Sequence, residues 1–147
     1  MAILKLIQAT AIIDAALAEG RRNNFALLGV AVLDAGGHMI AFKREDGASL
    51  LRFDLAYGKA WGALGMGFGT RELAERAAKN PAFVGALSAV SQGRMVPSPG
   101  GVLIAAADGE VIGAIGISGD TGDNDEICAI AGVKAAGLSA IPGAKGR

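Results

Sequence analysis

The sequence predicts an α/β fold of the α+β type, in which helices flank a central, mostly antiparallel sheet. Two pairs of apolar segments of strand length each surround a short turn, which is the pattern of a β-hairpin. Segments with helical periodicity precede, separate and follow these pairs. The order of helix, hairpin, helices, hairpin and helix indicates a sheet of at least four strands. The length of 147 residues suits one domain that spans residues 1–147.

The first half of the chain contains a helix, a hairpin and a long helix. Residues 3–22 carry alanine, leucine and isoleucine around most of a helical cylinder, which predicts a helix buried on more than one side. Residues 25–33 form an apolar run, residues 34–37 a turn and residues 38–43 a second strand. After a polar loop, residues 48–66 are again helical in pattern.

The second half begins with two short helices. Thr70 is expected to cap a helix over residues 71–78, and Asn80-Pro81 to start another over residues 82–90. Residues 102–107 and 110–118 are expected to pair about the Asp108-Gly109 turn, and a final helix to cover residues 124–138. Asp123 and Glu126 have the spacing of a capping box for that helix.

Composition excludes several classes of function. Fourteen basic and fourteen acidic residues cancel and form no basic run, so we expect no nucleic-acid partner. Charged residues and glycines interrupt every apolar stretch before it reaches membrane-spanning length, and the N-terminus does not resemble a signal peptide. The single cysteine permits no internal disulfide and no cysteine-cluster metal site. These observations favour a cytoplasmic protein without a membrane partner.

A glycine-rich stretch lies inside the long central helix. Residues 58–69 read GKAWGALGMGFG, although each glycine within a helix costs about 1 kcal/mol relative to alanine. Two interpretations remain open: close packing on the sheet or on another subunit, and a flat ligand that lies against exposed main chain. Lys59 lies in this stretch and is a candidate for anion binding or for a Schiff base, or is a lysine whose ammonium stays in water.

Two loops and one histidine are further candidates. The loop over residues 97–101 ends in Gly100 and Gly101, whose amides can form an anion-binding nest or simply shape a connection. The acidic loop over residues 120–126 can cap a helix, hold a hard cation or supply a general base, but it lacks the spacing of a calcium loop, and we expect no metal. His38 is the only histidine and is the candidate haem ligand, with a surface or packing role as the alternative.

Several motifs occur together in one order along nearly the whole chain. They are residues 32–38 (VLDAGGH), 44–48 (REDGA), 59–60 (KA), 99–102 (PGGV), 108–119 (DGEVIGAIGISG) and 125–126 (DE). In this combination the chain resembles the GlcG/HbpS-like family. The resemblance implies a profilin-like sandwich and symmetric homo-oligomers. It also implies mixed functions, because some members bind haem, one is the C-terminal domain of a cobalamin adenosyltransferase, and iron ligands differ between members.

Two functional hypotheses follow. The first is an oligomeric module that binds a small ligand or haem between the glycine-rich helix, the loop at Gly100 and Gly101, and the second hairpin. Its expected contacts are Trp61, Met66 and Phe68 with the ring, and Lys59 or Arg94 with a propionate.

The second hypothesis is a cofactor-independent isomerase or tautomerase that acts on a small carboxylic or keto acid. Lys59, Gly100 and Gly101 would bind the carboxylate, and Asp125 or Glu126 would move the proton. A scaffold without its own ligand is a third reading. The sequence leaves open the ligand, the presence of catalysis, the axial ligand and the number of subunits.

Overall fold

The computed structural model describes residues 2–145 and contains five helices and five strands within that range. In chain order the elements are α1 (Leu6–Arg22), β1 (Gly29–Asp34), β2 (Met39–Arg44), α2 (Leu51–Met66), α3 (Thr70–Lys79), α4 (Pro81–Val90), β3 (Gly101–Ala105), β4 (Val111–Ser118), α5 (Gly122–Ala135) and β5 (Ser139–Ile141). Among these residues, no helix has the length and apolar character needed to cross a bilayer.

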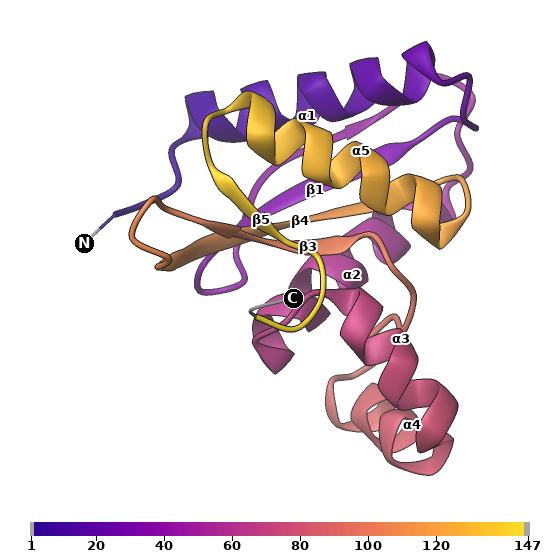
Figure 1. Cartoon of the computed structure of the whole chain (residues 1–147). Coiled ribbons are helices and arrows are strands. Elements are labelled where there is room, and N and C mark those ends of the chain that lie inside the picture. The colour runs from indigo at the N-terminus through magenta and orange to yellow at the C-terminus, as the bar shows by residue number, and fades with distance from the viewer. Residues whose placement is uncertain (1, 146–147) are drawn as a thin grey trace.

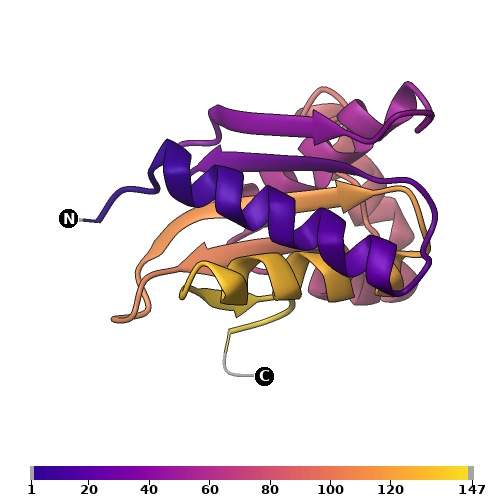
Figure 2. The ribbon, with the colours of Figure 1, turned by 90° about the horizontal axis from the view of Figure 1, so that it is seen from above.

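The strands form one antiparallel sheet in the order β2-β1-β4-β3-β5. The two predicted hairpins meet through β1 and β4, whose paired residues run from Gly29 opposite Ser118 to Asp34 opposite Gly113. Helices α1 and α5 cover one face, and α2 covers the other (Figures 1 and 2). The predicted fold class, an antiparallel sheet of two hairpins flanked by helices, is therefore confirmed.

The face beneath α1 and α5 carries a core of large aliphatic side chains. Strand residues that alternate along β1, β3 and β4 point toward these helices, and they pack with Ile12 and Ile13 of α1. The strand contributions are Val30, Val32, Val102, Ile104, Ile115 and Ile117, all fully buried. Burial of each such side chain stabilises the fold by about 1.5–3 kcal/mol. The buried residues of α1 face this core, whereas Leu6 and Ile7 near its start are exposed.

The opposite face holds α2 by a close approach of main chain to main chain. A Cβ atom added at Gly116 of β4 would lie 1.9 Å from the carbonyl oxygen of Ala56, and one at Gly101 of β3 would lie 2.3 Å from that of Lys59. Glycines of the helix itself face residues 94–96, since a Cβ at Gly58 would lie 2.8 Å from Val96 Cγ2. The glycine-rich helix is thus packed tightly within its own chain, which is the packing interpretation of the sequence.

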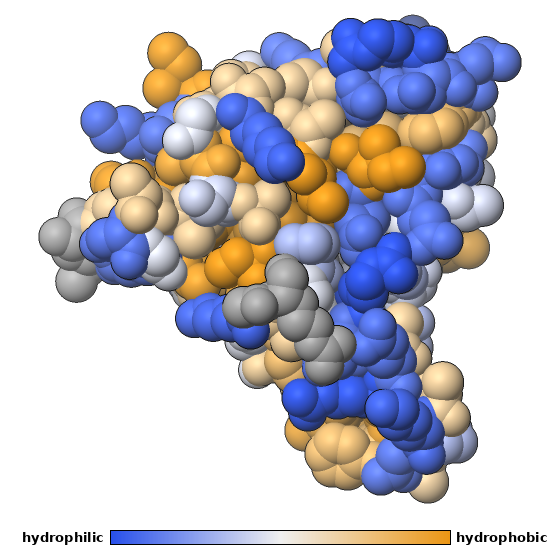
Figure 3. All heavy atoms as spheres, viewed as in Figure 1, coloured by the Kyte–Doolittle hydropathy of each residue, from blue (hydrophilic) through white to orange (hydrophobic). Residues whose placement is uncertain are grey.

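Helices α3 and α4 form an arm that projects from the body of the molecule (Figure 1). Figure 3 shows hydrophilic and apolar side chains next to one another on the surface of this arm. Asn80 caps α4 as predicted, because its side chain accepts a hydrogen bond from the backbone N–H of Phe83 at 3.3 Å.

Some local predictions were wrong. The cap of α5 is Thr121, whose side chain accepts a hydrogen bond from the backbone N–H of Asn124, so Asp123 and Glu126 do not form the predicted capping box. Thr70 is the first residue of α3 rather than its cap, and its Oγ1 accepts a hydrogen bond from the backbone N–H of Gly101. The last helix ends at Ala135, and Gly137, at φ +76°, leads into the unpredicted strand β5.

Candidate functional site

A buried ion pair joins α2 to α5. Lys59 Nζ lies 3.1 Å from Asp125 Oδ2, and the two side chains are 5% and 1% exposed. Asp125 Oδ1 accepts a hydrogen bond from the backbone N–H of Asp120 at 2.9 Å, so both carboxylate oxygens have partners within the chain. Because α2 and α5 lie on opposite faces, the pair connects the two faces beside the start of β3.

Burial perturbs both members of this pair. Loss of water lowers the pKa of Lys59 and raises the pKa of Asp125, and the attraction between the two charges opposes both shifts. A lysine that is buried and bound to a carboxylate meets no ligand at the surface. Contact between Lys59 and a substrate or a haem propionate would therefore require the pair to open.

Gly100 and Gly101 pack against this ion pair. Gly100 has φ +120°, and a Cβ there would lie 3.0 Å from Lys59 Nζ and 2.9 Å from the carbonyl oxygen of Ile117. The Gly101 amide donates to Thr70 Oγ1 at 2.8 Å. The Gly101 amide is therefore engaged inside the protein, and the side-chain-free loop makes room for Lys59.

Glu126 belongs to a separate cluster nearer the surface. Arg71 of α3 contacts both oxygens of Glu126 through Nε, at 2.9 and 3.1 Å, and reaches Asp123 Oδ1 through Nη2 at 2.5 Å. These hydrogen bonds raise the pKa of Arg71 above its usual range. Glu126 thus fastens α5 to the arm, whereas its neighbour Asp125 holds Lys59.

Trp61 and Arg94 lie together on the α2 side of the sheet. The Arg94 guanidinium stacks over the Trp61 ring at 4.0 Å from its centroid, and a Cβ at Gly37 would lie 3.3 Å from the indole. A small hollow of about 160 Å³ lies beside the ring, lined by Ala35, Gly36, Gly37, Trp61, Leu64 and Gly65. Met66 ends α2 nearby in sequence and is partly exposed.

His38 lies at a different place, in the turn between β1 and β2. Its Nδ1 is 3.3 Å from Asp34 Oδ1, and its side chain is 82% exposed. The same Asp34 oxygen accepts hydrogen bonds from the backbone N–H groups of Gly36 and His38, at 2.9 and 3.0 Å. The Asp34 carboxylate therefore stabilises the turn and orients the His38 ring with Nδ1 toward it.

A hollow of about 400 Å³ adjoins His38. Its walls are mostly apolar and come from the chain before α1, the first turn, β2 and the second hairpin. The lining residues are Ala2, Ile3, Leu4, Asp34, Ala35, Gly36, His38, Ile40, Glu110, Val111 and Ile112. Sequence reasoning missed the walls from residues 2–4 and 110–112, because these residues lie far from His38 in the chain.

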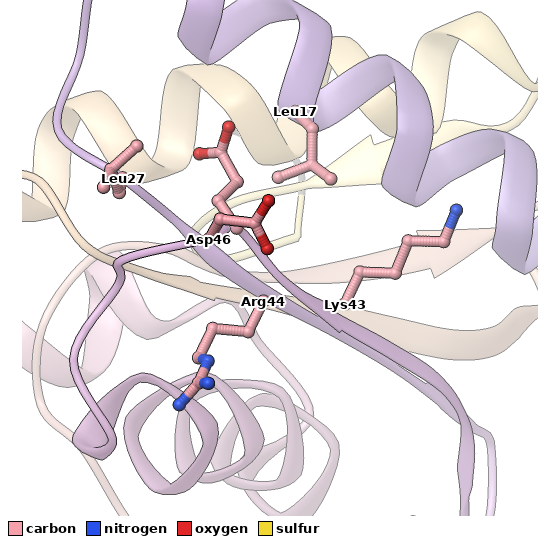
Figure 4. A pocket seen from close by; sticks show the side chains of 6 residues that line it. Leu17, Leu27, Lys43, Arg44 and Asp46 are labelled. Carbon is pink, nitrogen blue, oxygen red and sulfur yellow. The ribbon is translucent and has the colours of Figure 1, made fainter.

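A larger and more open hollow, of about 550 Å³, lies beside the end of β2 (Figure 4). Leu17 and Leu27 face a set of charged residues there, and Lys43 and Arg44 point to opposite sides of the strand. Lys43 pairs with Asp14 at 2.7 Å, and Glu45 pairs with Arg21 at 2.9 Å. Because Lys43 and Glu45 are compensated within the chain, these two side chains contribute little net charge with which to bind a ligand.

The structure thus separates the predicted site residues into groups. Lys59, Asp125, Gly100 and Gly101 lie together but are buried, Trp61 lies with Arg94, and His38 and Glu126 each lie elsewhere. Within residues 2–145, no three His, Cys, Asp or Glu side chains are arranged to hold a metal ion.

Three solved structures share this fold. The PduOC:heme complex is 28% identical with a TM-score of 0.84, covering 94% of this chain and 98% of that one. Protein ORFY of Klebsiella pneumoniae is 25% identical with a TM-score of 0.82, covering 93% of both chains. A double mutant of HbpS from Streptomyces reticuli is 30% identical with a TM-score of 0.77, covering 91% of this chain and 87% of that one.

Sequence comparison identifies the family. The chain is 33% identical over 98 residues to a 15.0 kDa protein from the dhaT-dhaS intergenic region of Citrobacter freundii, covering 67% of this chain and 68% of that protein. Residues 4–134 match the family described as haem degrading protein HbpS-like. The resemblance seen in the motifs is therefore confirmed, and the chain belongs to the HbpS-like family of haem degrading proteins.

Proposed function

We propose that this protein is an oligomeric module that binds haem. The observation that carries the proposal is the likeness over 94% of the chain to a structure described as a complex with haem, together with the family match. Family likeness alone does not assign an iron ligand, which depends on the residues present in this chain.

His38 fits the role of iron ligand. The Asp34 carboxylate faces Nδ1, which leaves Nε2 on the outer side of an imidazole that is 82% exposed. A carboxylate behind a metal-binding histidine fixes its tautomer and the orientation of its ring. Haem, when bound, would supply iron with an open coordination position, and His38 would occupy that position.

The hollow beside His38 fits an apolar ring. Ile3, Ile40 and Ile112 line a space of about 400 Å³, which is within the usual range for small-molecule sites. We therefore propose that haem lies on the α1 side of the first turn, rather than against Trp61, Met66 and Phe68 as the sequence predicted. Arg94 stays a candidate anion contact only for a ligand on the Trp61 side.

The proposal includes self-association because large apolar side chains remain exposed. They occur before and within α1, at the start of α2 and on α4: Ile3 at 69%, Leu6 at 62%, Ile7 at 77%, Leu50 at 77%, Leu51 at 54%, Phe53 at 43%, Phe83 at 57% and Val90 at 81%. Patches of this kind on a small domain are typical of surfaces that other subunits cover.

Titration with hemin tests the haem proposal. We expect a saturable shift of the Soret band with the wild-type protein, and a weaker and spectrally different complex with His38→Ala, because the iron loses its nitrogen ligand. Asp34→Asn keeps an acceptor for the turn but removes the charge behind the imidazole, and we expect its haem affinity to fall by about 10-fold to 100-fold.

Trp61→Phe is the matched control, because it changes an aromatic residue on the opposite side of the same turn. We expect it to leave the Soret spectrum unchanged. Absence of any Soret shift in the wild type would refute haem binding. A normal spectrum for His38→Ala with an altered one for Trp61→Phe would move the site to the α2 side.

The isomerase alternative receives no support from the relatives described above. Lys59 and Asp125 are close enough to act together, but each is the other's partner and both are buried. Glu126 is bound to Arg71 instead. These contacts favour structural roles for all three residues.

A further inference from the structure

We propose that the α3–α4 arm of one copy docks on the start of α2 of a second copy, around Leu50, Leu51, Phe53 and Asp54. This inference rests on the self-association included in the proposed function and assigns the surfaces that would form it. It is independent of where haem binds.

Helix α4 is apolar and mostly without a partner. It has no charged residue, and Val84 is its only buried side chain among the described residues. Phe83 is 57% exposed and Val90 is 81% exposed. A helix that is apolar around most of its circumference and projects from the body requires another surface to cover it.

The base of the arm combines this apolar surface with positive charge. A hollow of about 320 Å³ is lined by Arg76, Lys79, Asn80, Phe83 and Val84. Arg76 stacks over Phe68 at 4.5 Å and lies 3.9 Å from Glu72, whereas Lys79 has no ion-pair partner within residues 2–145. Such a hollow fits an apolar side chain that is followed by a carboxylate.

The start of α2 presents that combination. Leu50, Leu51 and Phe53 are exposed, and Asp54 follows them directly. Asp54 is exposed and has no hydrogen-bond or ion-pair partner in the described part of the chain. The two surfaces are therefore complementary in charge as well as apolar, which favours their contact.

A second copy is the partner that these observations favour. Each copy carries both surfaces, so each can present its arm to one neighbour and its α2 surface to another. A head-to-tail contact of this kind closes into a ring when the rotation between copies permits. Binding to a lipid surface would explain the exposed apolar side chains of α4, but it would not explain the exposed carboxylate of Asp54 beside the apolar start of α2.

Sedimentation velocity and native mass spectrometry over a range of protein concentrations test the contact. We expect wild-type oligomers, and a dissociation constant raised at least about tenfold by Phe83→Asp, Lys79→Glu or Asp54→Lys. The double variant Lys79→Glu/Asp54→Lys should regain most of the lost affinity, because the charges are exchanged. Lys134→Glu, a charge reversal at an exposed residue of α5, is the matched control.

Three outcomes would overturn the proposal. The wild-type protein could be monomeric, Phe83→Asp and Lys79→Glu could assemble as tightly as the wild type, or the double variant could fail to regain the affinity that the single variants lose. Phe83-dependent sedimentation with vesicles of phosphatidylcholine and phosphatidylglycerol, without self-association, would assign the arm to a membrane instead. Circular dichroism of each variant checks that it is folded. Hemin titration of the same variants separates the two proposals, because loss of assembly with a normal Soret shift leaves haem binding intact.

Discussion

The two faces of the sheet are packed by different means. Ile115 and Gly116 are neighbours on β4 and point to opposite sides. Ile115 is fully buried in the aliphatic core beneath α1 and α5, whereas a Cβ at Gly116 would lie 1.9 Å from the carbonyl oxygen of Ala56 in α2. One face therefore depends on side-chain volume and the other on the absence of side chains. The first should be sensitive to lost atoms and the second to added ones.

The largest expected effect comes from breaking the ion pair that joins the two faces. Asp125→Ala leaves the Lys59 ammonium buried without its carboxylate, and loss of one member of a buried pair typically costs about 3–5 kcal/mol. Urea unfolding followed by circular dichroism measures the change in the free energy of unfolding.

The double variant Lys59→Met/Asp125→Leu is the control for this experiment. It removes both charges and keeps apolar volume, so we expect it to be closer in stability to the wild type than Asp125→Ala is. If Asp125→Ala unfolds at the wild-type urea concentration, water solvates Lys59 and the pair does not link the faces.

The next effect is expected on the α1/α5 face. Ile115→Ala removes a fully buried side chain and leaves a cavity, which typically costs about 2–5 kcal/mol. Ala114→Gly is the matched change on the α2 face and should cost only about 0.5–1 kcal/mol. Equal losses in the two variants would show that the faces do not differ in their dependence on volume.

The reverse substitution should affect the α2 face. Gly116→Ala adds one methyl group where main chain occupies the space, so α2 must move, and overpacking of this kind costs about 1–3 kcal/mol. Gly143→Ala adds the same group where no atom lies within 4 Å, and we expect a change within about 0.5 kcal/mol. A stable Gly116→Ala protein would mean that α2 is held loosely.

The parts of the fold that could be predicted from the sequence are those with local signals. The hairpins and most helices have local signals, such as the Asp108-Gly109 turn and the Asn80-Pro81 start. Strand β5 has only three residues, Ser139–Ile141, and exists because β3 offers it an edge. No local pattern of a three-residue segment can reveal such a partner.

The candidate site was harder to predict for the same reason. The contacts of Lys59 with Asp125 join residues 66 positions apart, so the sequence showed two unusual residues but not that each satisfies the other. Asp34 and His38 are within one turn motif, yet their relation to Ile40 and Ile112 depends on how the two hairpins align. Residue chemistry was visible in the sequence, and residue environment was not.

The smallest expected effect concerns a link between the start of α5 and the segment before β1. Asp120 Oδ2 accepts a hydrogen bond from the backbone N–H of Ala26 at 2.6 Å, and Oδ1 accepts one from the Asn124 side chain at 2.7 Å. The bond from Ala26, followed by those from Thr121 and Asn124, lowers the pKa of Asp120. The stability that the Asp120 carboxylate contributes is therefore present above its unfolded pKa of about 3.9 and is lost as the pH falls through the lower folded pKa.

In Asp120→Asn, the free energy of unfolding measured with urea should therefore fall less steeply below about pH 4 than in the wild type. Asp46→Asn is the control, because it changes the net charge by the same amount. An equally steep acid limb in Asp120→Asn would show that this carboxylate does not hold α5 to the segment before β1.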